Sequence, residues 1–161
     1  MIPGRTPSQT VGPFYAIALC RETQSEVVPG GSLRIAGHVL DGAGEPVADA
    51  VVELWQADKG GTRWGRCGTD ATGRFEFKTE KPASMADEAP SVDVIVLARG
   101  LLKHLVTRLY FPDEPSANAA DPVLSSLEPR DRETLVATEA DGGLSFDIRL
   151  QGEKQTVFFA L

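Results

Sequence analysis

Apolar and polar residues alternate along most of this chain with a period of two, and turn residues interrupt the alternation at short intervals. The clearest case is LSFDIRL (144–150), in which every second residue is apolar: Leu144, Phe146, Ile148 and Leu150. Ser145, Asp147 and Arg149 occupy the opposite face. This alternation is typical of a strand that turns one face to a core and the other to water.

The same pattern predicts further strands along the chain. They are SLRIAGHVL (32–40), AVVELWQAD (50–58), SVDVIVLAR (91–99), HLVTRLYF (104–111) and TVFFA (156–160). The stretch CGTDATGRFEFKT (67–79) is predicted to form a hairpin around a turn at 70–73. Seven or more short strands with turns at this spacing predict an all-β fold, an antiparallel β-sandwich.

Helical signals are scarce. The best one is DPVLSSLEP (121–129), where Asp121 can cap a helix, Pro122 suits its first position and Pro129 ends it. We expect one or two short helices. The Pro- and acid-rich loop Lys81 to Pro90 is expected to be solvated, and the sequence assigns it no role.

The N-terminal segment TPSQTVGPFYA (6–16) is unusual for a chain end, because it carries two prolines and two adjacent aromatic residues. Pro7 and Pro13 disfavour helix at the residues before them, so this arm is predicted to be extended. An extended arm with apolar anchors requires a surface, in this domain or in another chain. We therefore divide the chain into an arm and connector (1–30) and a β-sandwich domain (31–161).

Composition narrows the classes of function. The 161 residues carry a formal net charge of −7 and show no basic block, which argues against a nucleic-acid partner. The sequence shows no signal peptide and no apolar run of membrane-spanning length, so a cytoplasmic location without membrane contact is expected. Cys20 and Cys67 lack CxxC spacing and are expected to be reduced, buried residues.

The residues that could carry chemistry are few. His38 and His104 are the two histidines, both inside predicted strands and far apart in sequence, and no HxH, HExxH or Cys/His cluster occurs. No GxSxG motif or phosphate-binding glycine loop is present. The residues alone therefore indicate a β-sandwich with an ordered arm and leave its function open.

Several blocks of sequence nevertheless carry a resemblance when they are taken in order. They are TPSQTVGPFYA, AVVELWQAD, GRCGTDATGRFEFKTEKP (65–82), LARGLLKHLVTRLYF (97–111), DPVLSSLEPRDRETL (121–135) and FDIRLQGEKQTVFF (146–159). Together they cover nearly the whole chain, which resembles the intradiol ring-cleavage dioxygenase family. Within it, the chain resembles the α subunits of the α/β enzymes that open protocatechuate (3,4-dihydroxybenzoate) with O2 to 3-carboxy-cis,cis-muconate.

The resemblance implies a ferric ion, but not in this chain. The family holds Fe(III) with two tyrosines and two histidines, the latter spaced HxH on a strand that corresponds to 91–99, where Ser91 to Asp93 supply no imidazole. Tyr15 and Tyr110 lie outside the stretch that carries the family's tyrosine ligands. The implied arrangement is an Fe(III) held by a partner β chain in a larger hetero-oligomer, with no metal ligand and no catalytic residue in this chain.

The resemblance also implies which residues line the substrate pocket from the α side. Thr10, Gly12 and Pro13 of the arm would reach the iron pocket of the β chain, and Gly12 would let the backbone approach a ligand closely. The alternative is that Gly12 and Pro13 form a turn that docks the arm on its own domain. Arg99 would meet the carboxylate of the aromatic acid. Its alternative is an exposed or interfacial ion pair with an acidic neighbour.

Two other functions remain open at this stage. One is an intradiol dioxygenase that works without a partner, which would need iron ligands that the sequence does not supply. The other is a non-catalytic β-sandwich that serves as a binding or assembly module. The sequence fixes neither the substituents of the aromatic acid nor the number of α/β units.

Overall fold

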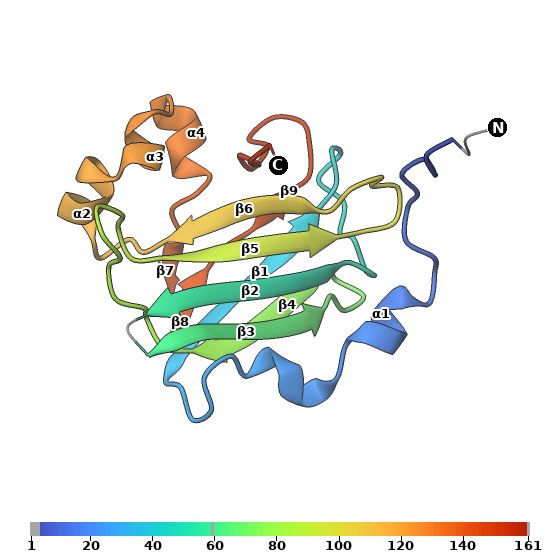
Figure 1. Ribbon diagram of the computed structural model, residues 1–161, viewed down its shortest axis with the longest axis horizontal. Helices are drawn as coiled ribbons and strands as arrows, with labels where there is room; N and C mark the ends of the chain where they lie inside the picture. The colour runs from blue at the N-terminus through green and yellow to red at the C-terminus, as the bar shows by residue number, and fades with distance from the viewer. Residues whose placement is uncertain (1–3, 59, 161) are drawn as a thin grey trace.

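Two β-sheets pack face to face in the computed structural model, which describes residues 4–58 and 60–160 (Figure 1). The front sheet has the order β3-β2-β5-β6 and is antiparallel throughout. Its strands are β2 (Val51–Asp58), β3 (Gly61–Gly68), β5 (Ser91–Leu97) and β6 (Leu105–Tyr110). The predicted all-β sandwich is confirmed.

The rear sheet is built around β1 (Leu33–Leu40). β4 (Arg74–Thr79) pairs with it antiparallel, whereas β8 (Gly143–Ser145) and β9 (Ile148–Arg149) pair with it parallel. β7 (Thr138–Ala140) completes the edge beside β8. The sandwich is therefore antiparallel except at this side of β1.

The core lies between the two sheets and consists of the apolar residues that alternate along the strands. Phe77 and Ile35 of the rear sheet are fully buried, as are Val52 and Val96 of the front sheet. Burial of such side chains supplies about 1.5–3 kcal/mol each, which is the main force that holds the sheets together. Cys67 packs against this core, and both cysteines are free thiols, as expected, but each is only partly buried, not buried as predicted.

The predicted hairpin at 67–79 is wrong, although its turn is present. Asp70 Oδ1 accepts hydrogen bonds from Thr72 N (2.8 Å) and Arg74 N (3.0 Å), which fixes the turn. However, β3 pairs with β2 in the front sheet and β4 pairs with β1 in the rear sheet. The turn chemistry is local, so it gives no information on whether the flanking strands pair or separate.

The last two predicted strands also differ from the structure. LSFDIRL has the predicted buried face but is divided into β8 and β9, because Asp147 Oδ1 accepts the hydrogen bond of His38 N (2.9 Å) where a backbone carbonyl would otherwise accept it. TVFFA forms no strand. Thr156 N donates to Arg149 O (3.1 Å) and Phe159 N to Val106 O (2.8 Å), so the segment passes from the rear sheet to the front one.

Short helices are more numerous than predicted. α3 (Pro122–Ser125) has the predicted cap, since Asp121 accepts from Val123 N and Leu124 N. Pro129 begins α4 (Pro129–Glu133) instead of only ending the preceding helix. The other helices are α1 (Tyr15–Leu19), the 3-10 helix η1 (Glu22–Ser25) and α2 (Pro115–Ala120). In the described part of the chain, no helix has the length and apolar character needed to cross a membrane.

Gly37 tests how closely β1 approaches the segment between β8 and β9. A Cβ at this position would lie 1.9 Å from the backbone oxygen of Phe146. We expect Gly37→Ala to destabilise the fold by about 1–3 kcal/mol, because a backbone atom rather than a flexible side chain must move. Thermal melting measures the loss, and Gly4→Ala is the control because a Cβ there meets no atom within 4 Å. Equal melting temperatures for the two variants would contradict this close approach.

Candidate functional site

The arm reaches the sandwich at the end of the front sheet where β5 ends and β6 begins (Figure 1). Residues 4–13 have no regular secondary structure, and α1 follows from Tyr15, so the prediction of an extended arm is wrong for its last two residues. The Tyr15 hydroxyl lies within hydrogen-bond distance of two backbone carbonyl oxygens, Asp49 O at 2.5 Å and Leu97 O at 2.9 Å, which share its single proton. This one side chain ties the arm to the segment before β2 and to the end of β5.

Thr10 makes the second attachment of the arm. Its Oγ1 accepts a hydrogen bond from Gly100 N at 2.8 Å. Gly100 has a φ of +91°, a conformation that favours glycine, and it directly follows Arg99. Two of the predicted site residues, Thr10 and Arg99, are thus brought together although they are 89 positions apart in the sequence.

Arg99 forms an ion pair with Asp49, in which its Nε contacts Oδ2 of the carboxylate. The arginine side chain is 58% exposed and that of Asp49 is 28% exposed. Among the described residues, the guanidinium has no other hydrogen-bond partner. The ion pair that was the alternative for Arg99 is therefore present, and most of the guanidinium still faces away from the chain.

Gly12 and Pro13 are exposed on the arm. Gly12 O accepts a hydrogen bond from Tyr15 N (3.3 Å), so the two residues form the turn that leads into α1. A Cβ at Gly12 would meet nothing within 4 Å, which means that this fold does not itself require glycine there. The role of Gly12 and Pro13 in facing a substrate stays a prediction.

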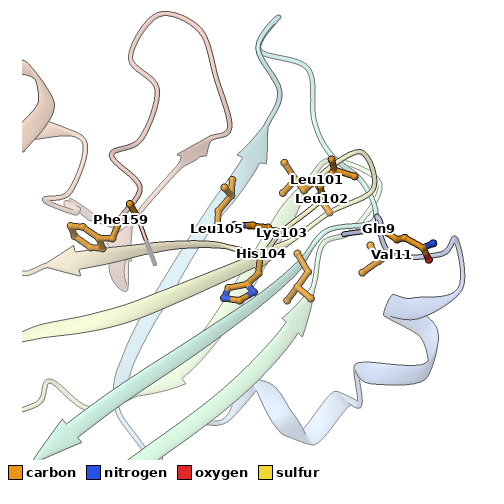
Figure 2. A pocket seen from close by; sticks show the side chains of 11 residues that line it. Gln9, Val11, Leu101, Leu102, Lys103, His104, Leu105 and Phe159 are labelled. Atoms are coloured by element: carbon orange, nitrogen blue, oxygen red, sulfur yellow. The ribbon is translucent and has the colours of Figure 1, made fainter. Parts of the chain in front are cut away.

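A cavity of about 560 Å³ lies beside the two arm attachments (Figure 2). It is lined by three separate segments: Gln9 and Val11 of the arm, residues 97–98 and 101–105, and Phe159 with Ala160 near the C-terminus. None of the four predicted site residues lines it, although Gln9 and Val11 flank Thr10. Sequence reasoning missed this cavity because no local pattern joins three segments that meet only in the fold.

Large apolar side chains are exposed around the same region. Of the six that the described residues expose, four belong to the arm or to the loop before β6: Phe14, Ile17, Leu19 and Leu102. Phe14 and Ile17 are more than 70% exposed. Large exposed apolar side chains of this kind are typical of a surface that another protein covers.

The residues present do not fit an iron centre. In the described part of the chain, no three His, Cys, Asp or Glu side chains gather into a group that could hold a metal. His38 lies in β1 with its Nδ1 3.1 Å from Asp147, whereas His104 lies just before β6 and lines the cavity. The hydroxyls of both tyrosines are engaged: Tyr15 as described, and Tyr110 with Asp121 (3.1 Å).

The segment that the resemblance aligns with the iron-binding strand is occupied by an ion-pair network. Arg108 Nε donates to Asp93 Oδ1 (2.8 Å), and its Nη1 donates to Glu88 Oε2 (2.9 Å). The side chain of Arg108 is largely buried. A structural role for this arginine accounts for all of these contacts, and Asp93 is not free to bind a metal.

Comparison with known proteins places these features in a family. The Dioxygenase family matches residues 15–99. The chain is 41% identical to the protocatechuate 3,4-dioxygenase alpha chain of Burkholderia cepacia, over 96% of each chain. It is 30% identical to the beta chain of the same enzyme from that organism, over 76% of this chain and 65% of the other.

A solved structure shares the fold. The dioxygenase domain of a carbohydrate-binding fusion protein from Streptomyces sp. SirexAA-E superposes with a TM-score of 0.63 at 24% identity, over 91% of this chain and 99% of that one. The alignment to the Burkholderia alpha chain extends over 190 positions, more than the 161 residues of this chain. That relative therefore has segments without a counterpart here.

The Tyr15 attachment predicts how the fold responds to alkali. Burial, followed by the nearby Asp49 and Cys20, raises the pKa of Tyr15 from 10.0 to about 12. Because the unfolded chain loses this proton near pH 10 and the folded chain retains it, the attachment contributes stability below pH 10 that is lost as the pH rises towards 12. We expect Tyr15→Phe to increase hydrogen exchange at 10–20 and to reduce the loss of stability between pH 10 and 12.

Tyr110→Phe is the matched control. In the wild-type chain, burial also raises the pKa of Tyr110 to about 12, but the Tyr110 hydroxyl donates to Asp121 beside α3, away from the arm. Exchange in the arm should then stay at the wild-type rate. If Tyr15→Phe leaves the exchange of the arm unchanged, its hydroxyl does not hold the arm.

Proposed function

The chain belongs to the intradiol dioxygenase family, and on this basis we propose that it is the α subunit of a protocatechuate 3,4-dioxygenase. In this proposal it pairs with a β chain, and the complex opens the ring of 3,4-dihydroxybenzoate with O2 to give 3-carboxy-cis,cis-muconate. The similarity to an alpha chain over 96% of both chains supports the assignment to the α side.

The observation that carries the proposal is the hydrogen bond from Gly100 N to Thr10 Oγ1. It brings the arm beside Arg99 while the arginine side chain stays 58% exposed, and the same arm and α1 expose Phe14 and Ile17. A chain that worked alone would gain nothing from leaving Phe14 and Ile17 in water. A partner that covers this face would bury them and close a pocket over Arg99.

The iron of the complex belongs to the β chain in this proposal. The family is iron-dependent, and the described residues of this chain offer no set of ligands that fits the ion. The α chain contributes binding and orientation. Arg99 would hold the substrate carboxylate, and Thr10, Gly12 and Pro13 would form the wall of the pocket on the α side.

This division of roles is chemically reasonable. Guanidinium keeps its proton at any relevant pH and can meet a carboxylate through two parallel hydrogen bonds. Holding the carboxylate fixes the position of the ring and therefore of the two hydroxyl groups at its other end. Orientation of this kind lowers a barrier without contact with the reacting atoms.

Co-expression with a β-type chain from the same genome tests the proposal. We expect iron and O2 uptake with 3,4-dihydroxybenzoate in the co-purified complex and neither in this chain alone, because the metal ligands are on the partner. Iron content and oxygen consumption are measured on both samples. Stoichiometric iron in the isolated chain, or a stable chain that neither pairs nor supports activity, would refute the assignment.

The role of Arg99 is tested in the assembled complex. Arg99→Ala should raise the KM for 3,4-dihydroxybenzoate by about 10- to 100-fold, since a hydrogen bond to a charged group contributes roughly 1.5–3 kcal/mol. Iron content should stay normal. The inhibition constant of 4-hydroxybenzoate should rise in the same proportion, and that of phenol should not change, because phenol lacks the carboxylate.

Arg74→Ala is the control for loss of an exposed cation. Arg74 pairs with Glu76 on the rear sheet and is 38% exposed. Its loss should leave both inhibition constants at the wild-type values. If Arg99→Ala weakens the binding of phenol as much as the binding of 4-hydroxybenzoate, Arg99 has no contact with the carboxylate.

A further inference from the structure

Asp49 faces Arg99 because of the register between two central strands. β2 and β5 run antiparallel with Val51 opposite Leu97. Asp49 lies in a turn two residues before β2, and Arg99 lies in a turn two residues after β5. The pairing of the two strands therefore brings these turns next to each other, and the Asp49 carboxylate meets Arg99 there.

The backbone around Asp49 is fixed on both sides by Thr69. Its hydroxyl donates to Val47 O at 2.7 Å and accepts from Ala50 N at 2.9 Å. Thr69 N also donates to Ala50 O (2.9 Å). Asp49 therefore sits on a held segment, although it lies in a connection rather than in a strand.

Asp49 has two contacts with separate partners. Its backbone oxygen accepts the hydrogen bond of the Tyr15 hydroxyl, which docks the arm, and its carboxylate pairs with Arg99. One residue thus joins the arm attachment to the guanidinium. An exposed ion pair of this kind contributes little to stability. Its contribution is therefore expected to be the orientation of the Arg99 guanidinium.

The edge of the guanidinium that Asp49 contacts decides what is left for a ligand. Arginine has five N–H donors in a planar fork, one on Nε and two on each Nη. Asp49 takes the Nε side. Among the described residues, neither Nη has a hydrogen-bond partner, and the side chain is 58% exposed, so a planar carboxylate can meet both Nη atoms side by side.

We propose that Asp49 is a positioning residue that holds Arg99 by its Nε edge and thereby presents the Nη edge to the substrate carboxylate. This inference rests on the proposed function, because it takes the ligand of Arg99 to be the aromatic acid. It adds Asp49 to the residues that recognise the acid, and it explains how Arg99 is oriented.

The test uses the α/β complex and a double-mutant cycle. Asp49→Ala keeps the backbone oxygen that holds Tyr15 and removes only the carboxylate. We expect the KM for 3,4-dihydroxybenzoate to rise by about three- to tenfold with little change in kcat, because an untethered arginine spreads over several rotamers. Asp49→Asn should restore much of the loss, since its amide oxygen can still accept from Nε.

The cycle separates an action through Arg99 from a general effect. In the Arg99→Ala background, Asp49→Ala should add no further rise in KM, because the group that it positions is gone. Hydrogen exchange of the arm should remain at the wild-type rate in Asp49→Ala. Glu76→Gln is the matched control, because it removes an exposed carboxylate paired with Arg74 and Arg34 on the rear sheet and should leave the KM unchanged.

The outcomes distinguish the positioning role of Asp49 from the proposed role of Arg99 as a substrate contact. Additive effects of Asp49→Ala and Arg99→Ala would overturn the positioning role, and so would a KM that falls when the carboxylate is removed. Either result leaves Arg99 as a substrate contact. If Arg99→Ala itself has no effect on KM, then both the role of Arg99 and this inference are refuted.

Discussion

The antiparallel register of β2 and β5 is the constraint on which the rest of the structure depends. These two strands lie at the centre of the front sheet, and alternate residues of each, such as Val52 and Val96, enter the shared core. A slip of one residue would turn that core to water, so the register is firmly fixed. The same register places Leu97 and Asp49 where Tyr15 can bond both, and places Arg99 across from Asp49.

The way in which the arm docks follows from this geometry. Its described attachments are hydrogen bonds made by the side chains of Tyr15 and Thr10. Phe14 and Ile17 remain exposed. Polar contacts fix the position of a segment without burying much apolar area, so they orient the arm but contribute little of the stability. The apolar side chains stay available to a second surface. In the proposed complex, the arm would form one half of an interface rather than an edge of the core.

The sequence predicted what depends on local pattern. The alternation in LSFDIRL identified the buried face, and the cap at Asp121 was correct. It failed where distant segments decide the outcome. Asp147 breaks a strand by bonding His38 N in β1, and the turn at 70–73 leads into the other sheet; neither event has a signal near its own position.

The same distinction applies to the candidate site. Thr10 and Arg99 were named from a family resemblance, but Asp49 was not, because its importance comes from the pairing of β2 with β5 and from Thr69, 20 positions further along the chain. The position of Asp49 and Arg99 beside two paired strands also bears on how the pair responds to changes in loop length. The Burkholderia alpha chain has segments without a counterpart here, and connections accommodate such differences far more easily than paired strands do. Asp49 lies two residues before β2 and Arg99 two residues after β5, so the pairing of these core strands brings their turns together. In the proposed complex, a recognition element beside paired strands would therefore be less sensitive to changes in loop length than one placed within a long loop.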